Sequence, residues 1–173
     1  MRWVALLRAV NLGARNKVPM AELRARLEAA GYGDVRTYVA SGNVLLDGPR
    51  SAAALSAELE SLIADAFGVA ATVMLRKPRE LAALVAAHPY GADTSETHVA
   101  FLAARPAKAA AARLEVAGAD VAVLAGANVY LRLPRGVHGS RLSGARIERL
   151  LGVPATLRNW RTVTTLAELA ADA

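Results

Sequence analysis

Two short segments combine cations and amides in a way that suits the binding of an anion. The first runs from Asn11 to Lys17 and includes Gly13 and Arg15, with Arg8 shortly before it. Gly13 permits unusual backbone angles, and the helix expected after the segment has free amide groups in its first turn. These groups would hold a phosphate or a carboxylate. The spacing matches neither a P-loop nor the dinucleotide-binding glycine pattern, so a surface loop kept soluble by its charges is the competing interpretation.

The second segment lies near the end of the chain and contains Arg158, Asn159, Trp160, Arg161 and Thr162. Arginine and asparagine can bind phosphates or base edges, and tryptophan can stack on a ring. In the competing interpretation, Trp160 anchors the last helix in the core, and Asn159 or Thr162 caps that helix. Together the two segments supply the seven candidate anion-binding residues: Arg8, Asn11, Arg15, Lys17, Arg158, Asn159 and Arg161.

Other residue types indicate no catalytic chemistry. His88, His98 and His138 are too scattered in the sequence to predict a metal site. His138 lies close to Ser140, but a serine at this place suits a helix N-cap better than a nucleophile. Acidic residues in the expected loops stand singly, without the pairing that two-carboxylate catalysis needs. We therefore assign no catalytic residue, metal or cofactor, and whether the chain is an enzyme stays open.

Composition predicts a globular protein with a basic half. The chain has 173 residues, 54% of them hydrophobic, with no cysteine and a net charge of +6. No stretch is apolar for long enough to predict a membrane span, and the absence of cysteine fits a reducing compartment, so we expect a cytoplasmic protein. Residues 130–165 hold seven arginines and one acidic residue, Glu148. Such an excess favours an anionic partner, although an arginine-rich composition would also produce it.

The elements that must position these residues occur twice. The segment 68–73 is echoed 84 residues later by 152–157, and 42–46 is echoed by 126–131. In the first half, hydrophobic periodicity predicts strands over 2–10, 35–40, 43–47 and 71–76, and helices over 19–31 and 51–67. In the second half it predicts strands over 97–103, 120–124, 128–133 and 155–158, and helices over 106–116 and 140–151. Further helices are expected over 78–87 and 162–171.

This order predicts an α+β fold in which a ferredoxin-like βαββαβ plait is duplicated in tandem, each copy followed by one extra helix. The expected divisions are a first lobe over 1–77, a connecting helix and loop over 78–96, a second lobe over 97–158, and a C-terminal helix over 159–173. Both faces of the first strand are apolar. The extra helices, the other lobe or a second subunit would therefore have to cover the second sheet face.

Several motifs at these spacings resemble one known family. They are the segment from Ala5 to Gly13, the run 20–23 after Lys17, the segment from Thr37 to Val44, and the segment from Arg158 to Val163. Together they resemble the bacterial domain-of-unknown-function 1697 family over residues 2–171. The resemblance implies a pair of related α+β plaits and no established reaction.

Three functions fit these observations. The leading one is a protein that binds an anionic ligand through its basic loops, with nucleic acid, and RNA in particular, as the leading case. Recognition by aromatic residues on the sheet is disfavoured, because aromatic residues make up only 5% of the chain and the third strands read Asn43-Val44-Leu45-Leu46 and Asn128-Val129-Tyr130-Leu131. The second is an enzyme that acts on a small phosphorylated or carboxylated metabolite in a cleft between the lobes. The third is a homo-oligomeric structural or interaction protein.

Overall fold

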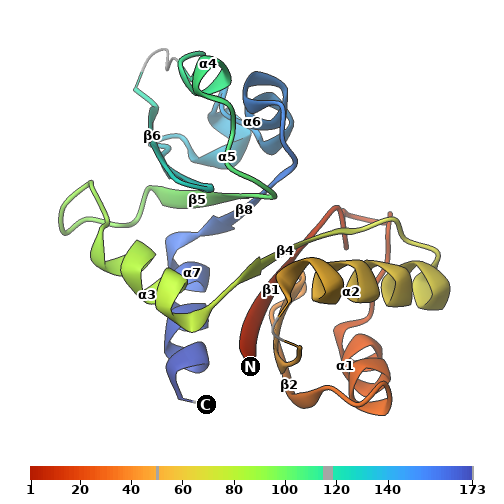
Figure 1. Cartoon of the computed structure of the whole chain (residues 1–173). Helices are drawn as coiled ribbons and strands as arrows, with labels where there is room; N and C mark the ends of the chain where they lie inside the picture. Colours follow the sequence, from red (N-terminus) through yellow and green to blue (C-terminus); the bar gives the residue numbers. More distant parts are fainter. Residues whose placement is uncertain (50, 115–118, 173) are drawn as a thin grey trace. The chain divides into compact units, whose positions relative to one another are not determined.

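The computed structural model describes residues 1–49, 51–114 and 119–172, and Figure 1 shows its elements. The chain divides into two compact units. Unit 1 consists of residues 1–83 together with the described residues from 165 onward, and unit 2 consists of residues 84–164. The divisions fall within two helices, α3 (Pro78–Ala86) and α7 (Trp160–Ala171). No described helix is long and apolar enough to span a membrane.

Unit 1 contains a four-stranded antiparallel sheet and two helices. Its elements are β1 (Arg2–Arg8), α1 (Met20–Ala29), β2 (Gly33–Tyr38), β3 (Asn43–Asp47), α2 (Ala52–Phe67) and β4 (Thr72–Arg76). The strands lie in the order β2-β3-β1-β4. This chain order and strand order are those of a ferredoxin-like plait.

Both helices of unit 1 cover the same face of the sheet. Trp3, Ala5 and Leu7 alternate along β1, as expected for residues that share one face of a strand. They are buried in one cluster with Leu27 of α1 and Leu59 of α2. The apolar periodicity of the two helices therefore builds the first core. Val4 and Leu6, on the opposite face of β1, are also fully buried.

Unit 2 repeats this arrangement. Its elements are β5 (Thr97–Leu102), α4 (Lys108–Ala111), β6 (Val121–Ala125), β7 (Asn128–Arg132), α5 (Gly136–Gly139), α6 (Gly144–Leu151) and β8 (Ala155–Asn159). The strands lie in the order β6-β7-β5-β8, which corresponds strand by strand to the sheet of unit 1. Ile147 and Leu151 of α6 pack with Ala100 and Leu102 of β5 in a second core. The predicted α+β fold with two related plaits is confirmed.

The helices of unit 2 differ from the prediction. A helix is expected over 106–116, but within the described residues it is the short helix α4, Lys108–Ala111. Residues 115 and 116 lie outside the described part of the chain. The helix expected over 140–151 is two helices, α5 and α6. The N-cap of α6 is Ser143, whose Oγ accepts the amide hydrogen of Arg146. The prediction that Ser140 is the N-cap is therefore wrong, because its Oγ donates to Asp120 and accepts from the amide of Leu142.

Candidate anion-binding site

The first candidate segment lies in the loop between β1 and α1, residues 9–19. Its backbone enters the left-handed region four times, at Ala9 (φ 64°), Asn11 (φ 52°), Gly13 (φ 57°) and Asn16 (φ 51°). Asparagine and glycine adopt this conformation more readily than other residues. The amide of Asn11 donates to the carbonyl of Asn16 at 2.8 Å, which closes the loop on itself.

The side chain of Asn11 fixes the shape of this loop. Its Nδ2 donates to the carbonyl oxygens of Val18 at 3.0 Å and Ala40 at 2.7 Å, and its Oδ1 accepts the amide hydrogen of Val18 at 2.9 Å. Asn16 adds a hydrogen bond from its Nδ2 to the carbonyl of Ala9 at 2.7 Å. Both amide hydrogens of Asn11 are thus used inside the protein. Asn11 therefore contributes to the candidate site by ordering its backbone.

Arg15 and Lys17 are exposed on this ordered loop. Among the described residues, no carboxylate lies within ion-pair distance of either side chain. The arginines of the neighbouring helix α1 differ in this respect, because Arg24 pairs with Glu28 and Arg26 with Glu22, both at 2.8 Å. The loop therefore presents two positive charges that the described part of the protein does not neutralise.

Arg8 is placed differently from these two cations. It is the last residue of β1, is only partly exposed, and lies opposite Thr72 of β4 in the sheet. The structure thus brings Arg8, Asn11, Arg15 and Lys17 to one end of the unit 1 sheet. Only Arg15 and Lys17 point charge freely into solvent.

A second loop is tied to the first. The hydrogen bond from Asn11 to Ala40 connects it to residues 39–42, and the amide of Leu7 donates to the carbonyl of Gly42 at 2.8 Å. Val39 in this second loop has φ 50°, although its side chain is branched at Cβ. That conformation costs about 1–2 kcal/mol, and Val39 remains 48% exposed. On the first loop, Leu12 is 59% exposed. Each of the two loops joined by the Asn11–Ala40 hydrogen bond therefore carries one exposed apolar side chain.

The second candidate segment is divided between interior and surface. Arg158 on β8 is 5% exposed, and its Nη1 donates to Thr156 Oγ1 and to the carbonyl of Leu157, both at 2.8 Å. Burial lowers the pKa of Arg158 to about 10. Asn159 Oδ1 accepts the amide hydrogen of Thr162, which is an N-cap bond for α7. Asn159 and Arg161 are exposed whereas Arg158 is buried, so the structure does not bring Arg158 and Arg161 to a common surface.

Trp160 is a buried anchor, as the competing interpretation of this segment held. It is 8% exposed, and its ring centroid lies 4.3 Å from that of His88. His88 also bonds to Thr97 at 3.0 Å. A tryptophan held in this way is not available for stacking on a base. Among the described residues, no group of histidine and acidic side chains is arranged to hold a metal ion.

The sheet register shows an equivalence that the sequence did not indicate. Arg76 of β4 lies opposite Val4, and Arg158 of β8 lies opposite Val99 at the corresponding position of the second sheet. Both arginines are buried, and burial lowers the pKa of each. Each also donates Nη1 to the carbonyl of the preceding residue. Arg158 thus belongs to a repeated interior feature, which only the register could reveal.

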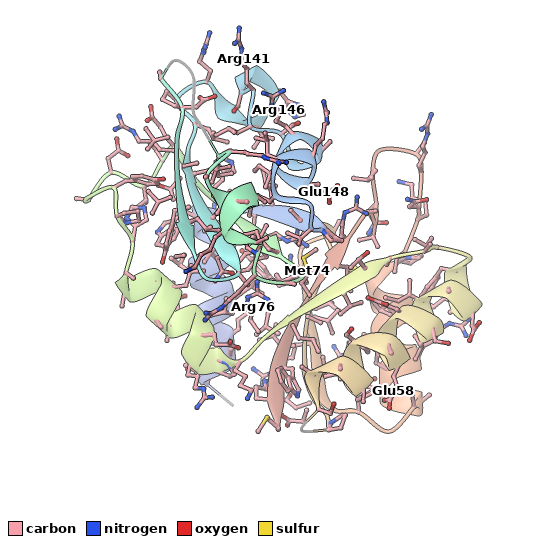
Figure 2. The ribbon with its side chains drawn as sticks, turned by 45° about the horizontal axis from the view of Figure 1, so that its top comes forward. Glu58, Met74, Arg76, Arg141, Arg146 and Glu148 are labelled. Carbon is pink, nitrogen blue, oxygen red and sulfur yellow. The ribbon has the colours of Figure 1, made fainter. Side chains whose placement is uncertain are left out.

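Exposed arginines in unit 2 form a further basic surface that the candidate residues omitted. Arg135, Arg141, Arg146 and Arg149 are exposed around α5 and α6. In the described part of the chain, none of them has an ion-pair partner. Figure 2 shows Arg141 and Arg146 at the outer surface of this unit. The sequence signal was the arginine excess of residues 130–165, but nothing in it told these side chains apart from the buried Arg158.

Comparison with known proteins supports the architecture. The model of the family described as "Protein of unknown function (DUF1697)" matches residues 1–130. The chain belongs to the DUF1697 family. It is also similar to a solved structure, the conserved bacterial protein SP0830 from Streptococcus pneumoniae, with a TM-score of 0.73, 24% identity and 98% coverage of each chain. No curated protein matches the chain.

The DUF1697 match includes one of the two basic surfaces. Residues 1–130 contain the whole loop from residue 9 to residue 19 and the second loop over 39–42. They end before the arginines around α5 and α6. The loop of unit 1 is therefore the candidate site that falls within the matched part of the DUF1697 family model.

Proposed function

We propose that this protein binds an anionic ligand, with RNA as the leading case, through the loop between β1 and α1. The observation that carries the proposal is the pair of exposed cations, Arg15 and Lys17, on a loop that Asn11 and Asn16 order internally. Cations held on an ordered backbone lose little conformational entropy when they bind phosphates. Phosphate contacts supply most of the sequence-independent affinity for nucleic acids.

The exposed arginines around α5 and α6 support the same proposal. They give unit 2 a basic surface of its own, so the positive charge is not confined to one loop. A chain with a net charge of +6 attracts polyanions over long distances at low salt. Of the two basic regions, the loop in unit 1 is the one whose shape is fixed by side-chain hydrogen bonds, and we assign ligand contact to it first.

The test is the salt dependence of binding to a fluorescent single-stranded RNA oligonucleotide. The double variant Arg15→Gln/Lys17→Gln removes the two free cations. We expect weaker binding, and a slope of log affinity against log salt that is shallower by about 1.4, because each lost single-strand phosphate contact removes about 0.7. The matched control, Arg24→Gln/Arg26→Gln, removes the same charge from ion-paired positions on α1 and should leave the slope unchanged.

Two outcomes would overturn this function. One is the absence of RNA binding by the wild-type protein at low ionic strength. The other is an equal loss in the two double variants, which would show a response to net charge alone and no site at the loop.

A further inference from the structure

We infer that the loop site takes single-stranded RNA, with unpaired bases packed on Leu12 and Val39 while Arg15 and Lys17 contact the phosphates. This inference rests on the proposed function and specifies its ligand. Its main support is that the two exposed apolar side chains, Leu12 and Val39, stand on two hydrogen-bonded loops, one of which also carries the two free cations.

The first step of the argument is the placement of Val39. A β-branched residue in the left-handed region destabilises the folded chain, and asparagine or glycine would fit there with less strain. Burial does not compensate for the strain, because the side chain is 48% exposed. Strained residues of this kind are concentrated at functional sites. Val39 is therefore better explained by contact with a ligand than by the packing of unit 1.

The second step is the proximity of apolar and charged groups. Leu12 is 59% exposed and forms an isolated bridge with Arg15, which places the two residues across a tight turn. Asn11, next to Leu12, donates to Ala40, next to Val39. This hydrogen bond thus connects the loop that bears Leu12 to the loop that bears Val39. The result is one surface with both apolar and cationic groups.

The third step is the choice of ligand. A single strand offers phosphates and exposed base faces together, whereas a duplex covers its base faces by stacking. Free phosphate offers no apolar surface for Leu12 and Val39. An acidic peptide would supply charge but no flat apolar ring for each anion. A single strand is thus the anion that matches both kinds of side chain.

The experiment compares one unstructured RNA strand with the same strand annealed to its complement. The variants are Leu12→Ser and Val39→Asn, and Val123→Thr is the control at an exposed valine in unit 2. We expect the wild-type protein to prefer the single strand, and each loop variant to weaken single-strand binding about fivefold, because the apolar surface that packs on the base is lost. The salt slope should not change, because no phosphate contact is removed.

The stability of the Val39→Asn variant separates ligand contact from folding. Asparagine tolerates the left-handed region, so the variant should unfold at the same or a higher urea concentration than the wild type while it binds the single strand more weakly. Equal binding of duplex and single strand, with wild-type affinity in both loop variants, would overturn the inference and leave RNA binding in place. A lack of any RNA binding would overturn the proposed function as well.

Discussion

The two units share a sheet but differ in the connection that follows its first strand. In unit 1, β1 leads to α1 through residues 9–19, which contain the left-handed loop and its free cations. In unit 2, β5 leads to α4 through the shorter connection 103–107. Because the second copy builds the same strand order without the longer loop, the plait does not require it. The extra length therefore points to a function at the place where the copies diverge.

The two sheets also differ at one edge strand, β2 in unit 1 and β6 in unit 2, in how regularly that strand pairs with its neighbour. β2 has a shift in its pairing with β3 between Gly33 and Arg36, and Asp34 within it has φ 39°. β6 pairs regularly with β7 and exposes Val121 and Val123. Charged residues and bulges on an edge strand oppose pairing with other chains. Unit 1 thus has an irregular edge strand that opposes pairing with other chains, together with the ordered loop over residues 9–19. Unit 2 has a regular edge strand and a shorter connection.

The largest effect is expected at the glycine of the first hairpin. A Cβ on Gly42 would lie 2.6 Å from Val10 Cγ2 and 2.8 Å from Leu7 Cβ, at a φ of +87°. Gly42→Ala should lower the free energy of unfolding by about 2–5 kcal/mol through overpacking and backbone strain. Gly126, in the corresponding hairpin, meets nothing closer than 3.8 Å, so Gly126→Ala should cost only about 1–2 kcal/mol. Urea unfolding measures both values, and equal losses would contradict the difference between the hairpins.

The next effect is expected at Asn11. Asn11→Ala removes three hydrogen bonds that order the loop, so the free energy of unfolding should fall by about 2–3 kcal/mol. RNA affinity should fall with it, although no phosphate contact is lost directly. Asn11→Asp keeps the acceptor for the amide of Val18 but sets a carboxylate oxygen against the carbonyls of Val18 and Ala40, so it should lose at least as much stability as Asn11→Ala. Wild-type stability in Asn11→Ala would show that these hydrogen bonds do not order the loop.

Periodicity predicted nearly all the strands and most helices, because burial on one face imposes a period of two or about 3.6 residues. It failed between Gly136 and Leu151, where α5 is too short to show a period and a serine that suits an N-cap makes other bonds. The echoed glycines, Gly68 and Gly152, are both left-handed C-caps. They mark equivalent helix ends.

The echo does not mark equivalent strand positions. Thr72, four residues after Gly68, lies opposite Arg8, whereas Thr156, four residues after Gly152, lies opposite Phe101. Leu6 is the counterpart of Phe101, since each lies opposite the first asparagine of its third strand. The register has shifted by two residues between the copies.

The sequence was enough to predict which residues belong to the candidate site, but not which of their side chains are exposed. The sequence identified the loop from Asn11 to Lys17, but it did not distinguish the ordering role of Asn11 from the free charges of Arg15 and Lys17. It also grouped Arg158 with Arg161, although one is buried and the other exposed. Those distinctions depend on hydrogen bonds to residues distant in sequence, such as Ala40, which local pattern does not encode.

A moderate effect is expected where α2 meets β4 in unit 1 and where α6 meets β8 in unit 2. Glu60 Oε1 accepts the amide hydrogen of Val73, and Glu148 Oε1 accepts that of Ala155, both at 2.8 Å. Val73 and Ala155 are register equivalents at the edge of each sheet. Glu60→Ala and Glu148→Ala should each lower the free energy of unfolding by about 1–2 kcal/mol, since each leaves an amide without its charged acceptor.

Glutamine variants are the control for these two positions. Glu60→Gln and Glu148→Gln keep an acceptor oxygen, so urea unfolding should give values between those of the alanine variants and the wild type. If one alanine variant keeps the wild-type free energy of unfolding while the other loses stability, the hydrogen bond from glutamate to the strand amide stabilises one copy only. It would then not be a shared feature of the plaits.

The smallest effect is expected in the pKa of one tyrosine in each unit. Burial, and then the carboxylate of Glu58 at 2.6 Å, raises the pKa of Tyr32 from 10.0 to about 12. Burial also raises the pKa of Tyr90 to about 12, while the charge of Arg132 opposes that rise. Glu58→Gln should therefore lower the pKa of Tyr32, and Arg132→Gln should raise that of Tyr90.

Absorbance titration of tyrosinate, read against Tyr32→Phe and Tyr90→Phe, measures both shifts. Because both folded pKa values lie above the unfolded value of 10.0, the protonated phenols favour the folded state. Their contribution to stability is complete below pH 10 and is lost as the pH rises toward 12. Shifts of the same sign in Glu58→Gln and Arg132→Gln would contradict the assignment, since a carboxylate raises the pKa of a phenol and a guanidinium lowers it.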